Sequence, residues 1–168
     1  MAGTLHIVAT PIGNLDDITA RAIKILGAAD LILCEDTRVA QKMLARFGIQ
    51  KPRESYHQHS TLRKADYILD LLREGKNLAL VSDAGTPGIC DPGNQLVSVA
   101  VEKFGDEIKI IPVPGASAVA ASLSVCGFCA DKFVFLGFPP AKNTRKKYFE
   151  ELLANEYTAV LSLPLIHI

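Results

Sequence analysis

Three short segments rich in glycine and proline each follow an apolar run, and they are the first places to expect chemistry. They read "TPIGN" (residues 10–14), "SDAGTPG" (82–88) and "PVPGASA" (112–118). Glycine lets backbone approach a ligand closely, and proline fixes a loop without offering an N–H donor. One such segment is typical of an ordinary turn. Three of them at strand ends favour a shared ligand pocket.

Side chains that could transfer a proton follow two other apolar runs. Glu35, Asp36 and Arg38 follow "DLILC", and His57 and His59 follow "RESY". Imidazole titrates near neutral pH and can serve as a general base, and a carboxylate can bind a ligand hydroxyl. The alternatives stay open, because the histidines could lie on a plain surface and Asp36 could cap the next helix.

Several other classes of site are disfavoured. No G-x-G-x-x-G follows the first strand and no G-K-[ST] phosphate loop is present, which argues against dinucleotide dehydrogenases and P-loop nucleotidases. "CGFC" (126–129) ends an apolar helical run, where the helix dipole does not stabilise a thiolate. Its cysteines are therefore predicted to be buried or incidental, and no metal site is expected. Lys142 and Arg145–Lys147 form either a solvated helix face or a contact with phosphates.

The composition is that of a globular protein with a real core. The chain has 168 residues, of which 49% are hydrophobic, with 18 basic and 18 acidic side chains. A balanced charge gives no sign of nucleic-acid binding by composition alone. No apolar run reaches the ~18 residues of a membrane span, and no signal peptide is visible. The predicted location is cytoplasmic, without a membrane partner.

Strand and helix patterns alternate along the chain. The helical patterns have capping residues at their starts and glycines near their ends. One helix is predicted to be capped by Asp17 or Thr19. Another is predicted to have Asp91 as its cap and Pro92 at its first position, with Val97, Val101 and Phe104 as its buried stripe. The strands are predicted at 5–9, 30–36, 53–57, 77–82 and 108–113, and the helical patterns begin near residues 19, 37, 60, 91 and 115.

This alternation predicts an α/β fold with a five-stranded parallel sheet and helices on both faces. The small-residue helix "GASAVAASLSV" is expected to pack closely on a sheet. "FVFLGF" then restarts the pattern with a strand, a helix and another strand. We therefore predict a first domain over 1–127 and the incomplete start of a second α/β domain over 131–168.

The chain resembles a known family over residues 4 to about 161. "VATPIGNLDDIT", "ADLILCEDTR", "ALVSDAGTPGICDPG", "VPGASA" and "FVFLGFPPAK" are similar to the ribosomal RNA small subunit methyltransferase I family, within the tetrapyrrole methylase superfamily. The resemblance implies transfer of a methyl group from S-adenosylmethionine to the ribose 2′-hydroxyl of a cytidine in small-subunit (16S) ribosomal RNA. It also implies a homodimer that acts on the 30S subunit, with the donor in a cleft between two α/β domains.

The resemblance assigns roles to particular residues. The catalytic residues it favours, together with their placement after strands, are His57, His59 and Arg38. The predicted donor-binding residues come from the three loops, and they are Pro11, Gly13, Ser82, Asp83, Ala84, Gly85, Thr86, Pro87, Gly115, Ala116 and Ser117.

The chain departs from the family pattern in two places. The family continues for roughly another hundred residues, about the size of a small domain, and carries a Glu-Ser/Thr-x-His-Arg pattern where this chain reads "SLPLIHI". Ser60 also stands where the family has Asn. Two alternatives stay open: a methylase of tetrapyrroles or other small molecules, and a truncated, non-catalytic donor-binding module. The strand-four loop speaks against the first, since it reads "SDAGTP" rather than Gly-Gly-Asp-Pro.

Overall fold

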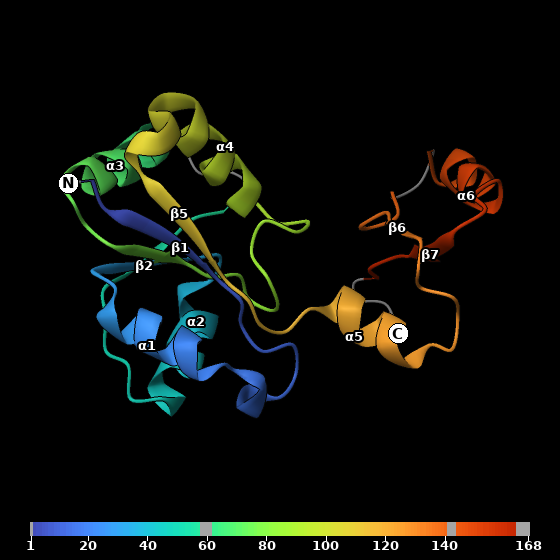
Figure 1. Ribbon diagram of the computed structural model, residues 1–168, viewed down its shortest axis with the longest axis horizontal. Helices are drawn as coiled ribbons and strands as arrows, with labels where there is room; N and C mark the ends of the chain where they lie inside the picture. Colours follow the sequence, from blue (N-terminus) through green and yellow to red (C-terminus); the bar gives the residue numbers. More distant parts are fainter. Residues whose placement is uncertain (1, 58–61, 141–143, 164–168) are drawn as a thin grey trace. The chain divides into compact units, whose positions relative to one another are not determined.

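The protein was analysed as a computed structural model, which describes residues 2–57, 62–140 and 144–163. The chain divides into two compact units, one up to Ser117 and one from Ala118 onward. The first unit contains a five-stranded parallel sheet in the order β3-β2-β4-β1-β5 (Figure 1). Its strands are β1 (Thr4–Val8), β2 (Leu31–Cys34), β3 (Arg53–Ser55), β4 (Leu78–Leu80) and β5 (Lys109–Val113). The predicted parallel sheet is confirmed.

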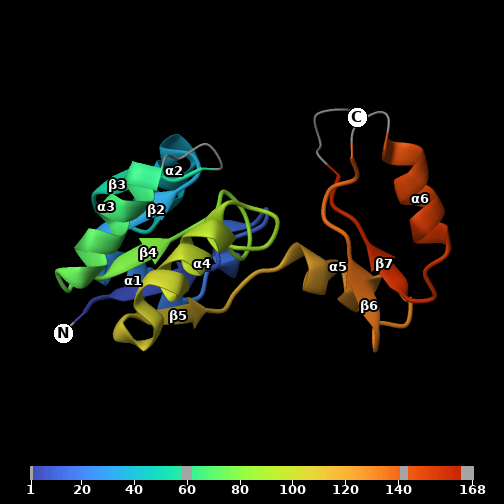
Figure 2. The same cartoon turned by 90° about the horizontal axis from the view of Figure 1, so that it is seen from above.

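Helices cover both faces of this sheet, also as predicted. They are α1 (Ala20–Ala28), α2 (Thr37–Arg46), α3 (Leu62–Arg73) and α4 (Gly93–Phe104), with short 3-10 turns η1 (Leu15–Asp17) and η2 (Gly105–Glu107). Figure 2 shows the same elements from a second direction. Within the described residues, no helix is both long enough and apolar enough to cross a membrane.

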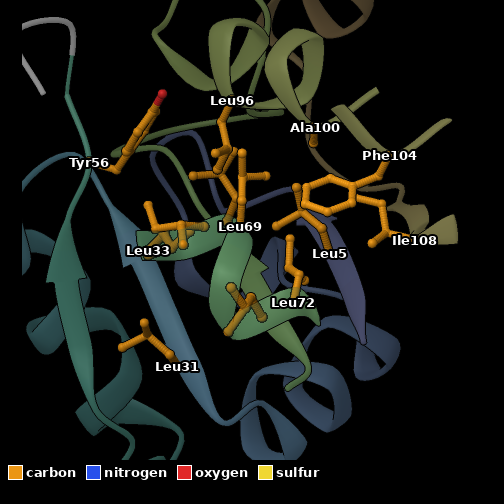
Figure 3. Packing of buried hydrophobic residues seen from close by; sticks show 13 residues of the cluster. Leu5, Leu31, Leu33, Tyr56, Leu69, Leu72, Leu96, Ala100, Phe104 and Ile108 are labelled. Carbon is orange, nitrogen blue, oxygen red and sulfur yellow. The ribbon is translucent and has the colours of Figure 1, made fainter. Parts of the chain in front are cut away.

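The two faces of the sheet carry separate hydrophobic cores because successive side chains of a strand point to opposite sides. In β2, Leu31 and Leu33 join one core while Ile32 and Cys34 join the other. The first core packs against α3 and α4 and includes Leu69, Leu72, Leu96 and Phe104 (Figure 3). The second core packs against α1 and α2. Unit one therefore has a complete α/β/α sandwich.

Helix capping agrees with the sequence at α1 and at α2, where Asp36 was one of the alternatives, and differs at α4. The Thr19 hydroxyl accepts from the Ala22 N–H at 3.0 Å, one of the two caps predicted there. At α2 the cap is Asp36, whose Oδ1 accepts from the Arg38 N–H at 2.8 Å. Asp91 is not the cap of α4, because the helix begins one residue later, after Pro92. The predicted caps of α3, Ser60 and Thr61, lie outside the described residues.

The buried stripe predicted for α4 is confirmed at Phe104, which is 5% exposed and in the core, and is wrong at Val101. Val97 is half-buried and Val101 is 52% exposed, whereas Leu96 and Ala100 are completely buried. Nearly every residue from 96 to 101 is apolar, so the pattern did not define one face. A Cβ added to Gly93 would lie 3.0 Å from Leu80 Cδ2, which places the start of the helix directly on β4. The face of the helix that packs in the core carries Leu96, Ala100 and Phe104.

Substitutions on the two sides of α4 should therefore differ in cost. We expect Leu96→Ala to lower the free energy of unfolding by about 2–5 kcal/mol, because it opens a cavity in a closed core. Val101→Ala should change it by less than about 0.5 kcal/mol, since that side chain faces solvent. Urea unfolding followed by circular dichroism measures both. Equal losses of unfolding free energy in the two variants would mean that Val101 is buried, as the sequence predicted.

The second unit is small and open. It contains α5 (Ala118–Val125), β6 (Phe133–Phe135), α6 (Arg145–Leu153) and β7 (Thr158–Val160), with β6 and β7 paired in parallel. Gly137 is the single buried residue among its described positions. No residue of α5 is buried, and the close packing on a sheet expected for this helix stays a prediction. The predicted domain limits, 1–127 and 131–168, would assign α5 to the first domain, and they stay a prediction.

Candidate functional site

The topology of the sheet makes the carboxyl ends of its central strands the candidate ligand position. β4 lies between β1 and β2. The helix after β4, α4, belongs to one core, whereas α1 and α2, which follow β1 and β2, belong to the other. After β4 the chain therefore crosses one face of the sheet, whereas after β1 and β2 it crosses the other face. Open parallel sheets bind ligands where the connections of neighbouring strands diverge in this way. The loops that follow these strands are the candidate site.

The loops after β1 and β4 are joined by several hydrogen bonds. The Thr10 N–H donates to the Gly85 carbonyl at 2.9 Å, and the Gly85 N–H donates to the Thr10 carbonyl at 3.1 Å. The Thr10 hydroxyl donates to the Ser82 carbonyl at 3.1 Å. The Ser82 hydroxyl donates to the Gly85 carbonyl at 3.2 Å. Thr10 and Ser82 are both buried, so these bonds hold the base of the two loops together.

The loop after β5 joins the same group. The Thr86 hydroxyl donates to the Ala116 carbonyl at 3.3 Å. A Cβ added to Gly85 would lie 3.5 Å from Ile12 Cγ2 and 3.8 Å from the Ala116 oxygen, so this glycine lies where the three loops meet. Gly115 lies against Ala9, where an added Cβ would come within 2.9 Å. The three segments singled out in the sequence are therefore brought together.

The predicted donor-binding residues differ in what they can contact. Gly13, Asp83, Ala84 and Gly115 are exposed, and they form the accessible surface of the loops. Thr86, Ala116 and Ser117 are half-buried. The remaining members, which are buried and support the loops from beneath, are Pro11, Ser82, Gly85 and Pro87. Their role in donor binding stays a prediction.

A group of carboxylates lies beside the loop after β4. Glu35 directly follows β2 and is half-buried, and it lies near enough to Asp83 for the two charges to interact. Burial, and then the charges of Asp83 and Asp91, raise the pKa of Glu35 above its ordinary value. Asp83 Oδ1 in turn accepts from the Asp36 N–H at 3.2 Å. These contacts connect the ends of β2 and β4.

Arg38 has a different environment from the one predicted for a catalytic residue. Its Nη2 lies 2.7 Å from Asp36 Oδ2, and its side chain is 86% exposed. Hydrogen bonds from Arg38 lower the pKa of Asp36 to about 2. Asp36 thus caps α2 and pairs with Arg38, and a catalytic role for Arg38 stays a prediction.

An open cavity of about 530 Å³ lies next to the carboxylates. Glu35 and His57 line one part of it, from the ends of β2 and β3, and His57 is exposed. His59, the other predicted base, lies outside the described residues. The rest of the lining comes from the segment that starts α4, namely Cys90, Asp91, Pro92, Asn94 and Gln95.

Sequence reasoning missed the α4 side of this cavity. The signal was present, because an Asp-Pro pair at a helix start after β4 must lie near the ends of the neighbouring strands. Asp91 closes the preceding loop, since its Oδ1 accepts from the Gly88 N–H at 2.8 Å and the Gly93 N–H at 2.7 Å. This geometry orients the first turn of α4 along the cavity.

The cysteines do not form a site in the described part of the chain. Cys34 is buried, and burial raises its pKa to about 11. Cys90, Cys126 and Cys129 are exposed and free, so the "CGFC" thiols are not buried. Among the described residues no group of His, Cys, Asp and Glu has the arrangement of a metal site.

Comparisons with known proteins agree with this fold. Residues 4–164 match the family described as Tetrapyrrole (Corrin/Porphyrin) Methylases. Two curated relatives, both named "Ribosomal RNA small subunit methyltransferase I", come from Synechocystis sp. and Xylella fastidiosa. The Synechocystis protein is 46% identical over 95% of this chain and 56% of its own length. The Xylella protein is 49% identical over 92% of this chain and 55% of its own length. The chain thus spans about half the length of these relatives.

Solved structures are similar in fold at low sequence identity. A diphthine synthase has a TM-score of 0.74 at 16% identity, covering 98% of this chain and 66% of its own. The methyltransferase CobJ has a TM-score of 0.69 at 17% identity, covering 95% and 67%. A uroporphyrin-III-C-methyltransferase from Thermus thermophilus has a TM-score of 0.60 at 21% identity, covering 82% and 61%.

Proposed function

Because the chain belongs to the tetrapyrrole methylase family, we propose that it serves methyl transfer from S-adenosylmethionine to the ribose 2′-hydroxyl of a cytidine in small-subunit ribosomal RNA. The observation that carries the choice of acceptor is the 46% identity to a ribosomal RNA methyltransferase over 95% of this chain. The proposed partners are the 30S subunit and a second copy of the chain in a homodimer, in the cytoplasm.

The loops at the carboxyl edge fit the proposed donor. Exposed backbone at Gly13, Ala84 and Gly115 allows close approach of a flat or extended ligand. The Asp83 carboxylate is exposed beside them and can accept hydrogen bonds from ribose hydroxyls. Asp83, Asp91 and Glu35 also make this edge negative, which favours a cationic sulfonium. When bound, the donor supplies an already activated methyl group.

The protein then has two tasks: to orient the acceptor hydroxyl and to receive its proton. His57 lines the cavity beside the loops and is one proposed base, with His59 and Arg38 as the other proposed catalytic residues. Contact with the RNA backbone is proposed for Arg145, Lys146 and Lys147, which are exposed on α6. Both lysines also pair with a glutamate one helical turn further along. Lys146 Nζ lies 3.8 Å from Glu150 Oε1, and Lys147 Nζ lies 3.7 Å from Glu151 Oε1. Lys142 lies outside the described residues.

A second candidate is a donor-binding module without catalysis. It is favoured by the second unit, where one described residue is buried and Phe128, Leu153 and Leu163 are at least 69% exposed. A small-molecule methylase is the third candidate, and its support is weaker. The corrinoid and porphyrin enzymes share the fold at 15–21% identity, which carries no substrate information.

The test uses purified small ribosomal subunits and S-adenosylmethionine with a labelled methyl group. RNA digested to nucleosides should contain labelled 2′-O-methylcytidine, identified by mass spectrometry. A full-length relative serves as the positive control. Donor binding by calorimetry without methyl transfer would select the donor-binding module, and label on a nucleobase would refute the ribose acceptor.

A further inference from the structure

Resting on the proposed methyl transfer, we propose that the Glu35 carboxylate receives the proton of the acceptor hydroxyl, and that the cavity in front of it holds the acceptor nucleoside.

The position of Glu35 relative to the donor loop is the first argument. Glu35 directly follows β2, and β2 pairs directly with β4. The Asp36 N–H, one residue further on, donates to Asp83 Oδ1 in the loop after β4 at 3.2 Å. This hydrogen bond holds the segment that carries Glu35 against the loop proposed to carry the methyl donor.

The cavity supplies the second argument. Its volume of about 530 Å³ is in the range of small-molecule sites and can hold a nucleoside. The α4 segment contributes Asn94 and Gln95 to the lining, and both residues are exposed. Primary amides both donate and accept hydrogen bonds, which suits the edge of a nucleobase. The ribose of a nucleoside held there would face the end of β2.

The charges around Glu35 favour a proton-accepting role. Asp83 faces it from the β4 loop, and Asp91 faces it from the start of α4. His57 and Cys90 line the same cavity. A pKa raised by burial and by these neighbours makes Glu35 hold a proton more tightly than an ordinary carboxylate.

The proposed step balances without a further reactant. The ribose oxygen forms a bond to the methyl carbon, and the bond between that carbon and sulfur breaks with its electron pair retained by sulfur. The hydroxyl proton passes to a Glu35 carboxylate oxygen, and from there to solvent through the open cavity.

The first measurement compares Glu35→Gln with the unmodified chain in methyl transfer to small subunits. Glutamine keeps the size and shape of glutamate, so the loop should stay in place. We expect the transfer rate to fall by about 10²–10⁴-fold, with the donor dissociation constant within about twofold. The matched control is Glu102→Gln, an exposed glutamate of α4, which should leave the rate unchanged. Transfer that survives Glu35→Gln would overturn the assignment while leaving the proposed function intact.

The second measurement needs no turnover. The carboxyl carbon of Glu35 is followed by NMR across pH in the presence of the pentanucleotide ApApCpApA, and of the same pentanucleotide with 2′-deoxycytidine at its centre. A ribose hydroxyl that donates to Glu35 should lower the pKa of Glu35 relative to the deoxy form, and Glu35→Gln should abolish the preference for ribose. Equal effects of the two oligonucleotides would overturn the proposal. If the unmodified chain shows the ribose preference but transfers no methyl group, the proposed activity is contradicted and the assignment of Glu35 stands.

Discussion

Replacing Gly85 with valine is expected to weaken binding of S-adenosylmethionine by about 10-fold or more, while unit one stays folded. Gly85 has a φ of +85°, a conformation that costs a β-branched residue about 1–3 kcal/mol. Its Cβ would also enter the junction between Ile12 and the Ala116 carbonyl. The loop can relieve both by moving outward, which disturbs the surface formed by Asp83 and Ala84. A loss of 1.4 kcal/mol in binding is a tenfold change.

Calorimetry on the folded variants measures this effect. Gly27→Ala is the control, because an added Cβ at Gly27 in α1 meets no atom within 4 Å and its φ lies outside the left-handed region. Gly115→Val is unsuitable as a second probe. Its Cβ would come within 2.9 Å of Ala9 Cβ, so it would disturb the end of β1 as well as the loop. Unchanged donor affinity in folded Gly85→Val would remove the loops from the proposed site.

Backbone amides of the second unit should exchange with solvent several orders of magnitude faster than those of the central sheet. In unit one, β1 and β4 lie inside the sheet between two complete cores. In unit two, β6 and β7 form a two-stranded sheet, and Gly137 is the single buried residue in the described part. Few buried apolar contacts mean a low free energy of local opening. Two strands alone are marginal in water.

Hydrogen exchange read by mass spectrometry resolves the two units. We also expect self-association through residues 131–168, because Phe133, Phe138 and Leu153 are at least 46% exposed. Protection of β6 and β7 should then rise with protein concentration, in parallel with the mass from light scattering. Strong protection of β6 in a dilute monomer would show that the unit is stable by itself.

The local elements of this protein were predictable because they depend on neighbouring residues. Apolar strands, the Thr19 cap of α1 and the glycine after α2 all follow from contacts within a few residues. The three glycine-rich loops were identified for the same reason, since they follow strands in the sequence and parallel strands end at one edge. Their meeting at Gly85 agrees with that reasoning.

The sequence by itself determined the strands, the helices, the parallel class of the sheet and the loops at its edge. Only the tertiary structure decided which strands are neighbours, that Leu96 rather than Val97 faces the core, and that Glu35 lies against Asp83. Residues 96–101 of α4 are nearly all apolar, so local pattern leaves its buried face open, and the core contacts of Leu96, Ala100 and Phe104 decide it. The contact of Glu35 with the β4 loop joins residues 48 positions apart (83 − 35), and it exists because β4 pairs beside β2. Strand order and helix rotation are set by long-range packing, which no local pattern encodes.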